Sequence, residues 1–305
     1  MRSQLFSCRF NPIICPFVLR IMTIGLFIHI PLSVQAGEAK QLRYNLLPGE
    51  SVSYSTTTDL KQTIGEMQFS MGTSISTNVD TKVDAIDNNN STLSVSYRNT
   101  KITTSGMAMA GISDGTTDYE EFSNNNESLT LSERGQIITR MLKASKKSGK
   151  LNPMERNAQA AVKTLGYLFT EFPEKPLKVG DNWVITRNDT TGNKNENQII
   201  SLAKIQYTLA NYTDTLGTPC AVLKCRSLTS SISGSMEMMG NSMNFEGDGS
   251  LIGKVYVELA TGMTLTSTIN NQIEMRISMG GQDGMIMPIS VDTHSTINRM
   301  TTANK

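Results

Sequence analysis

The chain has 305 residues, of which 18% are charged, and its 28 Lys and Arg against 27 Asp and Glu give a formal net charge of +1. A chain this close to neutral lacks the basic surface that nucleic acids and anionic membranes require, so we expect neither as a partner. The length suits one or two domains, with enough chain to bury a sizeable hydrophobic core.

The first 36 residues have the organisation of a secretory signal peptide. Residues 1–20 contain three arginines and no acid, residues 21–34 are almost wholly apolar, and small residues stand at Val34 and Ala36. The apolar run is shorter than the roughly 20 residues that a membrane-spanning helix needs. We therefore predict cleavage after Ala36 and export of the mature chain, residues 37–305, to the periplasm or the extracellular space. No later run is apolar and long enough to form a transmembrane helix.

Residues 37–150 are predicted to form an N-terminal β half. Between Met67 and Ala85 the odd positions carry Met, Phe, Ile, Val and Thr, whereas the even positions are mostly Ser, Asn, Asp and Lys. Alternation with a period of two is typical of an antiparallel strand with one buried face. The asparagines at 88–90 predict the turn that follows.

Residues 111–115, GISDG, match the G-x-S-x-G motif of serine hydrolases, which needs a sharp turn from a strand into a helix. The segment that follows, TTDYEEFSNNN, is polar and has no helical stripe. We interpret the motif as a hairpin turn and expect no catalytic site. A serine hydrolase using Ser113, His294 and Asp292 is the enzymatic alternative.

Residues 151–173 are predicted to form a linking amphipathic helix. Asn152 can cap its N-terminus, Pro153 fits its first turn, and a second proline ends it. Its apolar stripe consists of Met154, Ala158, Ala161, Leu165, Leu168, Phe169 and Phe172. We expect Leu165 and Phe169 to fill the concave faces of the sheets on either side.

Residues 174–305 are predicted to form a C-terminal β half. Odd positions are again mostly apolar over 263–279 and 285–293, and the GGQDG between them predicts a hairpin turn. Cys220 and Cys225 lie in a predicted strand, where they would be roughly 16 Å apart, far beyond the reach of a disulfide. We expect two reduced or buried thiols.

The two halves are similar in sequence at an offset of about 130 residues, as in LLPGESVSY at 46–54 and PLKVGDNWV at 176–184. The predicted fold class is therefore mainly β with one amphipathic helix (α+β). Two related curved antiparallel sheets, or half-barrels, are expected around a central helix.

The segments LRYNLLPGESVSYS at 42–55 and FPEKPLKVGDNWV at 172–184 carry a Gly-acid strand entry and a Pro-x-x-Pro-x-x-x-Gly-Asp-x-Trp motif. In these features the chain resembles an uncharacterised family of exported bacterial β-rich proteins, a domain of unknown function. The expected fold is also similar to periplasmic lipoprotein carriers. Because the family has no established activity, the resemblance implies no catalytic residue and no cofactor.

Methionine is unusually frequent, with 18 residues, twelve of them in four places. In an antiparallel meander these places fall at one end of the sheet in each half. We predict a deformable apolar mouth there, because flexible Met side chains suit varied ligands. The candidate ligand-binding residues are Met67, Met71, Met107, Met109, Met236, Met238, Met275, Met279, Met285 and Met287.

Two other interpretations of the methionines stay open, namely core filling and a Cu(I) or Ag(I) site. Soft thioethers select Cu(I), but no His or Cys lies near these positions, so we expect no metal and no cofactor. The sequence favours an exported, non-catalytic binding protein for a hydrophobic ligand, either lipid-like or a peptide. An envelope scaffold that acts through protein contacts is the main alternative, and the oligomeric state stays open.

Overall fold

The computed structural model describes residues 38–65, 69–106, 114–118, 126–143, 168–191, 197–215, 217–238, 241–279 and 285–300. They all belong to one compact unit, Gly37–Lys305. Within these residues there are twelve strands and no helix. The strands are β1 (Ser51–Ile64), β2 (Phe69–Asp87), β3 (Asn90–Ser105), β4 (Gly115–Asp118), β5 (Asn126–Ser132), β6 (Ile137–Lys143), β7 (Asn182–Thr191), β8 (Asn197–Thr215), β9 (Thr218–Met238), β10 (Asn241–Glu258), β11 (Thr264–Met279) and β12 (Met285–Arg299).

All twelve strands form one antiparallel sheet in the order β6-β5-β3-β2-β1-β12-β11-β10-β9-β8-β7, with β4 paired to β3. The prediction of two sheets around a central helix is therefore wrong. The first and last strands join the two halves edge to edge, because β1 pairs with β12 from Tyr54 opposite Arg299 to Ile64 opposite Ile289. The described part of the chain is all-β, and the α+β class is wrong for it.

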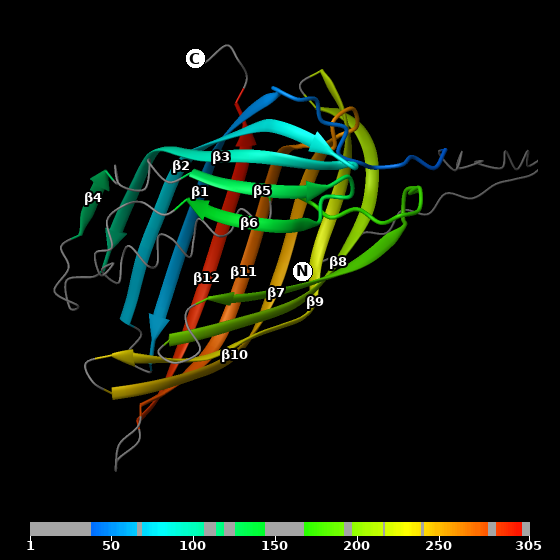
Figure 1. Ribbon diagram of the computed structural model, residues 1–305. Coiled ribbons are helices and arrows are strands. Elements are labelled where there is room, and N and C mark those ends of the chain that lie inside the picture. The colour runs from blue at the N-terminus through cyan, green and yellow to red at the C-terminus, as the bar shows by residue number, and fades with distance from the viewer. Residues whose placement is uncertain are drawn as a thin grey trace, which may run out of the picture. The chain divides into compact units, whose positions relative to one another are not determined.

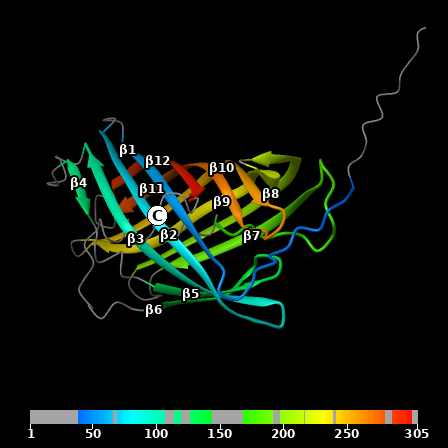
Figure 2. The same ribbon diagram turned by 90° about the horizontal axis from the view of Figure 1, so that it is seen from above.

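The sheet curls, so that strands far apart in its order share one core (Figures 1 and 2). Val79 and Leu93 from β2 and β3 belong to the same buried cluster as Ile205 and Leu223 from β8 and β9. We call the concave side, which carries this cluster, the inner face and the other side the outer face. The alternation predicted from the sequence is confirmed on β2, where the odd positions from Ile75 to Val83 are buried.

Glycines on the inner face permit the tight bend of β9, β10 and β11. A Cβ at Gly234 would lie 2.6 Å from the ring of Phe245, and one at Gly253 would lie 2.9 Å from the sulfur of Cys225. Where a sheet is strongly concave its inward side chains converge, and a residue without a side chain relieves the crowding. Glycine at these positions of β9 and β10 therefore lets the two strands approach their neighbours closely.

Two irregular segments, 38–50 and 168–181, cross one end of the curled sheet, which we call the closed end. Tyr44 stacks on Phe172 with ring centroids 5.3 Å apart, and its hydroxyl accepts a 2.9 Å hydrogen bond from the Thr170 N–H. The Thr264 hydroxyl donates to the Leu168 carbonyl at 2.7 Å. These contacts join the two segments to each other and to the first residue of β11.

The predicted helix 151–173 falls partly on this closed end. Residues 151–167, with Leu165, lie outside the described residues, whereas residues 168–173 are irregular and not helical. Leu168, Phe169 and Phe172 are nevertheless buried, with at most 2% of each residue exposed. Their apolar spacing reflects packing on Tyr44 and its neighbours rather than a helical face.

The two predicted Gly-acid strand entries have the same hydrogen-bond pattern. The carboxylate of Glu50 accepts from the Leu47 N–H at 3.1 Å, and that of Asp181 accepts from the Lys178 N–H at 2.9 Å. Gly49 and Gly180 both have positive φ. The Gly49 N–H donates to the Val83 carbonyl on β2, and the Gly180 N–H donates to the Leu209 carbonyl on β8. The sequence similarity of the two halves is thus matched by equal local structure at their first turns.

Several local predictions are confirmed. Asn88 and Asn89 form the two-residue turn between β2 and β3 with φ values of 48° and 64°, as a type I′ hairpin requires. Cys220 and Cys225 are both free and buried.

Candidate ligand-binding site

The last residues of β1, β9 and β11 and the first residues of β2, β10 and β12 lie at the end of the sheet opposite the closed end, which we call the methionine end. There the strand register places four methionines in one row across four strands. Met243 on β10 is the partner of Met236 on β9 and of Met279 on β11, and Met279 is the partner of Met285 on β12. Directly opposite residues have Cβ atoms about 4.5–5.5 Å apart, so the row is continuous.

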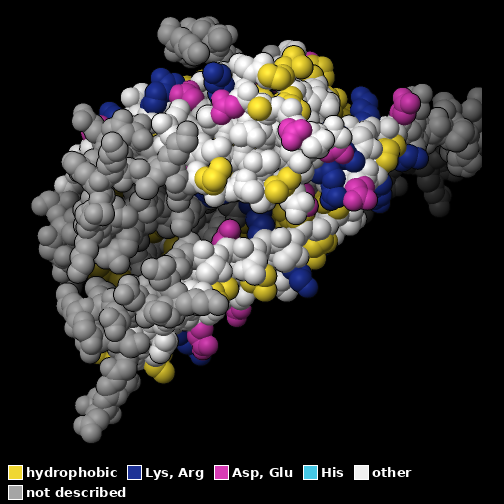
Figure 3. Space-filling view, viewed as in Figure 1, with side chains coloured by type: hydrophobic (Ala, Val, Ile, Leu, Met, Phe, Trp, Pro, Cys, Tyr) yellow, Lys and Arg dark blue, Asp and Glu magenta, His cyan; other side chains and the backbone are white. Residues whose placement is uncertain are grey.

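Two more apolar rows follow toward the closed end. One joins Phe245, Ile277 and Met287, and the next joins Met275, Ile289, Ile64 and Phe69. All of these positions have the parity of the inner face. Met275, Ile277 and Met287 are half-buried, and 58% of Met285 is exposed. The inner face therefore retains partly exposed apolar side chains at the methionine end. Figure 3 shows a recess between the two arms of the curled sheet.

The ten predicted site residues are only partly placed. Met71, Met275, Met285 and Met287 are described and lie on the inner face at the methionine end. Met236, Met238 and Met279 are placed by their backbone register alone. Met67, Met107 and Met109 lie outside the described residues. Whether these residues bind a ligand stays a prediction.

The predicted site lacked the isoleucines and the phenylalanine that complete these rows, and it also lacked a belt of polar side chains beside them. We call Thr73, Thr293, Asn271 and Gln62 the polar belt. The first three lie in one row, with Leu60 between Thr73 and Thr293, and Gln62 lies one row nearer the methionines. The signal was present, because Asn271 and Thr293 occupy apolar phases of the alternating pattern.

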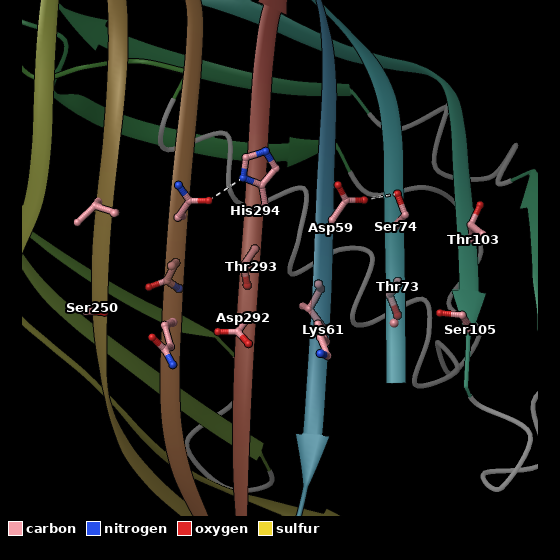
Figure 4. A pocket seen from close by; sticks show the side chains of 16 residues that line it. Asp59, Lys61, Thr73, Ser74, Thr103, Ser105, Ser250, Asp292, Thr293 and His294 are labelled. Atoms are coloured by element: carbon pink, nitrogen blue, oxygen red, sulfur yellow. Dashed lines mark hydrogen bonds between the residues drawn. The ribbon is translucent and has the colours of Figure 1, made fainter. Parts of the chain in front are cut away.

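A groove of about 540 Å³, lined mainly by polar residues, lies on the outer face of β3, β2, β1, β12, β11 and β10 (Figure 4). Asp59 accepts a 2.6 Å hydrogen bond from Ser74, and Nδ1 of His294 lies 2.7 Å from Oδ1 of Asn270. Asp59 and His294 are direct partners between β1 and β12.

The groove contains Asp292 and His294, two of the three residues of the serine hydrolase alternative. His294 shares the outer face with Asp292, but its bonded partner is Asn270. Ser113 lies outside the described residues, so the hydrolase alternative stays a prediction. Among the described residues no three His, Cys, Asp or Glu side chains are grouped closely enough to hold a metal ion.

The charged side chains of the inner face include Glu127 and Arg187. Glu127, which is 4% exposed, accepts two hydrogen bonds from Arg140 at 2.8 and 3.0 Å. Arg187 on β7 also has inner-face parity, and the positive charge of its guanidinium lowers the pKa of the Cys225 thiol. Burial nevertheless raises the pKa of that thiol to about 11, so it stays protonated and unreactive at neutral pH.

Comparisons with known proteins give no family. No family model matches the chain, and no curated protein matches it. An outer membrane channel from Pseudomonas putida F1 is similar in structure with a TM-score of 0.26 and 8% identity, over 84% of this chain and 97% of that chain. A TM-score this low carries no argument. The resemblance to exported proteins and to lipoprotein carriers stays a prediction. In the part of the chain that the structure describes, no helix has the length and hydropathy to cross a bilayer.

Proposed function

We propose that this chain is an exported, non-catalytic binding protein that holds a hydrophobic or amphiphilic ligand against the inner face of its sheet at the methionine end. The observation that carries the proposal is the set of apolar rows that end in Met285, Met287 and Met275 and remain partly uncovered inside the curl. Covering apolar surface yields about 25 cal/mol per Å², so an acyl chain laid along these rows would be bound with favourable free energy.

The chemistry of the rows also supports a ligand without fixed shape. Thioether side chains have several rotatable bonds and adapt to irregular partners, whereas the closed end is filled by aromatic rings such as Tyr44, Phe172 and Trp183. A packed core at one end and adaptable apolar surface at the other is the arrangement that a binding protein needs. The predicted signal peptide would place this protein outside the cytoplasm, where apolar ligands require a carrier through water.

The proposal is tested by calorimetric titration of the purified mature protein with stearate. Ile277→Lys places a charge in the middle of an apolar row and should abolish binding. Ser278→Lys is the matched control, because Ser278 is the next residue on β11 but lies exposed on the outer face. Circular dichroism should show that both variants fold. Absence of stearate binding to the wild-type protein, or equal binding by both variants, would contradict the proposal.

A further inference from the structure

The polar belt interrupts the apolar inner face between the closed end and the methionine rows. The side chains of Thr73, Thr293, Asn271 and Gln62 are half-buried. None of the four makes a side-chain hydrogen bond to another described residue. In Figure 4 the side chains of Thr73 and Thr293 lie behind their strands, on the opposite side from His294, although both residues also border the outer groove. Their donors and acceptors are therefore directed into the curl.

Water reaches half-buried polar groups in the free protein. A ligand that displaces this water must supply hydrogen bonds of its own, because removing an amide or hydroxyl from water without a hydrogen bond is unfavourable. The belt offers several donors close together. Asn271 and Gln62 each carry an NH₂ group, and Thr293 carries a hydroxyl next to Asn271 in the register. A ligand group with several acceptor oxygens would match them.

A positively charged side chain, that of Arg187 on β7, lies farther round the inner face, four strands from Asn271 on β11. The row that contains Gln62 runs through Val291 and Ile273 to Gly249. A Cβ at Gly249 would lie 3.1 Å from the Ser230 hydroxyl, and from Ser230 the register continues through Ala203 to Arg187. Arg187 thus stands on the same level of the inner face as the belt but four strands from Asn271, and its positive charge has the sign that attracts an acidic head group.

On the basis of the proposed function, we infer that the ligand is a single-chain amphiphile with an acidic head group, such as a long-chain carboxylate, bound with its head inward. The carboxylate accepts hydrogen bonds at Asn271, Thr293 and Gln62, and the acyl chain runs along the apolar rows toward the methionine end. The head group lies about four rows inside the mouth, because Asn271 precedes Met279 by eight residues on β11, or about 27 Å.

The single tryptophan of the chain reports this orientation. Trp183 stacks on Tyr207. The row of paired residues that contains Tyr207 continues through Cys225 and Gly253 and reaches β11 at Ile269. Ile269 precedes Asn271 by two residues. Along the strand direction Trp183 is thus about 7 Å from the belt and about 34 Å from the row of Met279. A quencher on the ligand should therefore affect its fluorescence according to position along the chain.

The experiment uses two stearates, with a nitroxide either near the carboxylate or near the methyl end, and follows quenching of Trp183 emission after equilibrium dialysis has measured binding. Stronger quenching by the first probe supports head-inward binding. Equal quenching, or stronger quenching by the second, overturns this inference but leaves the proposed function intact. If dialysis shows no binding of either probe, both the proposed function and this inference are wrong.

Variants at two neighbouring asparagines give an independent check with unlabelled stearate. Asn271→Leu removes a belt donor and should weaken binding by roughly two- to twelvefold, the size of one net hydrogen bond. Asn270→Leu is the matched control, since Asn270 lies on the outer face against His294. A loss with Asn271→Leu alone supports the inference, and unchanged or stronger binding by that variant overturns it.

Discussion

Met275 on β11 lies directly over Gly247 on β10, so that a Cβ atom at the glycine would stand 2.7 Å from both Cα and Cβ of the methionine. Because one of those atoms is backbone, a side-chain rotation cannot relieve the clash. Gly247→Ala should therefore lower the free energy of unfolding by about 1–3 kcal/mol, as expected for an overpacked core. Urea denaturation measures the effect. Asp248→Ala, on the exposed outer side of the same strand, should be close to neutral, and equal effects from both would contradict this account of the bend.

The closed end should be the most sensitive part of the core. Phe172 is fully buried and stacks on Tyr44, so Phe172→Ala should cost about 3–5 kcal/mol and lower the thermal midpoint sharply. Val179→Ala, in the same irregular segment but 51% exposed, serves as the control. A small and equal shift for the two variants would show that the segment 168–181 does not stabilise the sheet.

The Cys225 thiol should make stability depend on pH in the alkaline range. Burial raises its pKa from 9.0 to about 11. Between these values the unfolded chain has lost the proton and the folded chain has kept it, so the stabilising contribution is complete below pH 9 and is lost as the pH rises to 11. Urea unfolding across this window should show that the wild-type protein loses on the order of 2–3 kcal/mol more than Cys225→Ala. Buried tyrosines contribute equally to both proteins, and parallel pH profiles would exclude the effect.

The ion pair between Glu127 and Arg140 should contribute to the free energy of unfolding. Glu127 is almost completely buried, and Arg140 is its bidentate partner. Arg140→Met would leave the carboxylate buried without its counter-charge, so we expect a loss of about 3 kcal/mol or more in unfolding free energy. The double variant Glu127→Leu with Arg140→Met should recover most of that loss. A double variant no more stable than the single one would mean that Arg140 acts through packing instead.

The sequence predicted the faces of the strands better than their arrangement. Alternation assigned Ile75, Ile273 and Met287 to the buried side, because burial of one strand face imposes a local period of two. The pairing of β1 with β12 has no local signal, since it depends on curvature and on edges brought together from opposite ends of the chain. Two sheets were therefore expected where one exists.

The helix was predicted wrongly and the polar belt was not predicted, for different reasons. The spacing of Phe169 and Phe172 fits a helical stripe, but an irregular segment packed on Tyr44 satisfies the same spacing. Asn271 was visible as a polar residue in an apolar phase, yet only the register shows that Thr293 stands beside it. A site assembled from four strands is a property of their pairing, which periodicity alone does not contain.

Peroxide oxidation with peptide mapping, in the absence and presence of stearate, tests the central claim most directly. Thioethers that contact water oxidise to the sulfoxide, and packed ones resist. Met285, Met287 and Met275 should therefore oxidise faster than Met263, which is 2% exposed. Stearate should protect the first three and leave Met263 unchanged. If stearate binds and these methionines oxidise as fast as before, or if they oxidise no faster than Met263 without it, the inner face at the methionine end is not the binding surface.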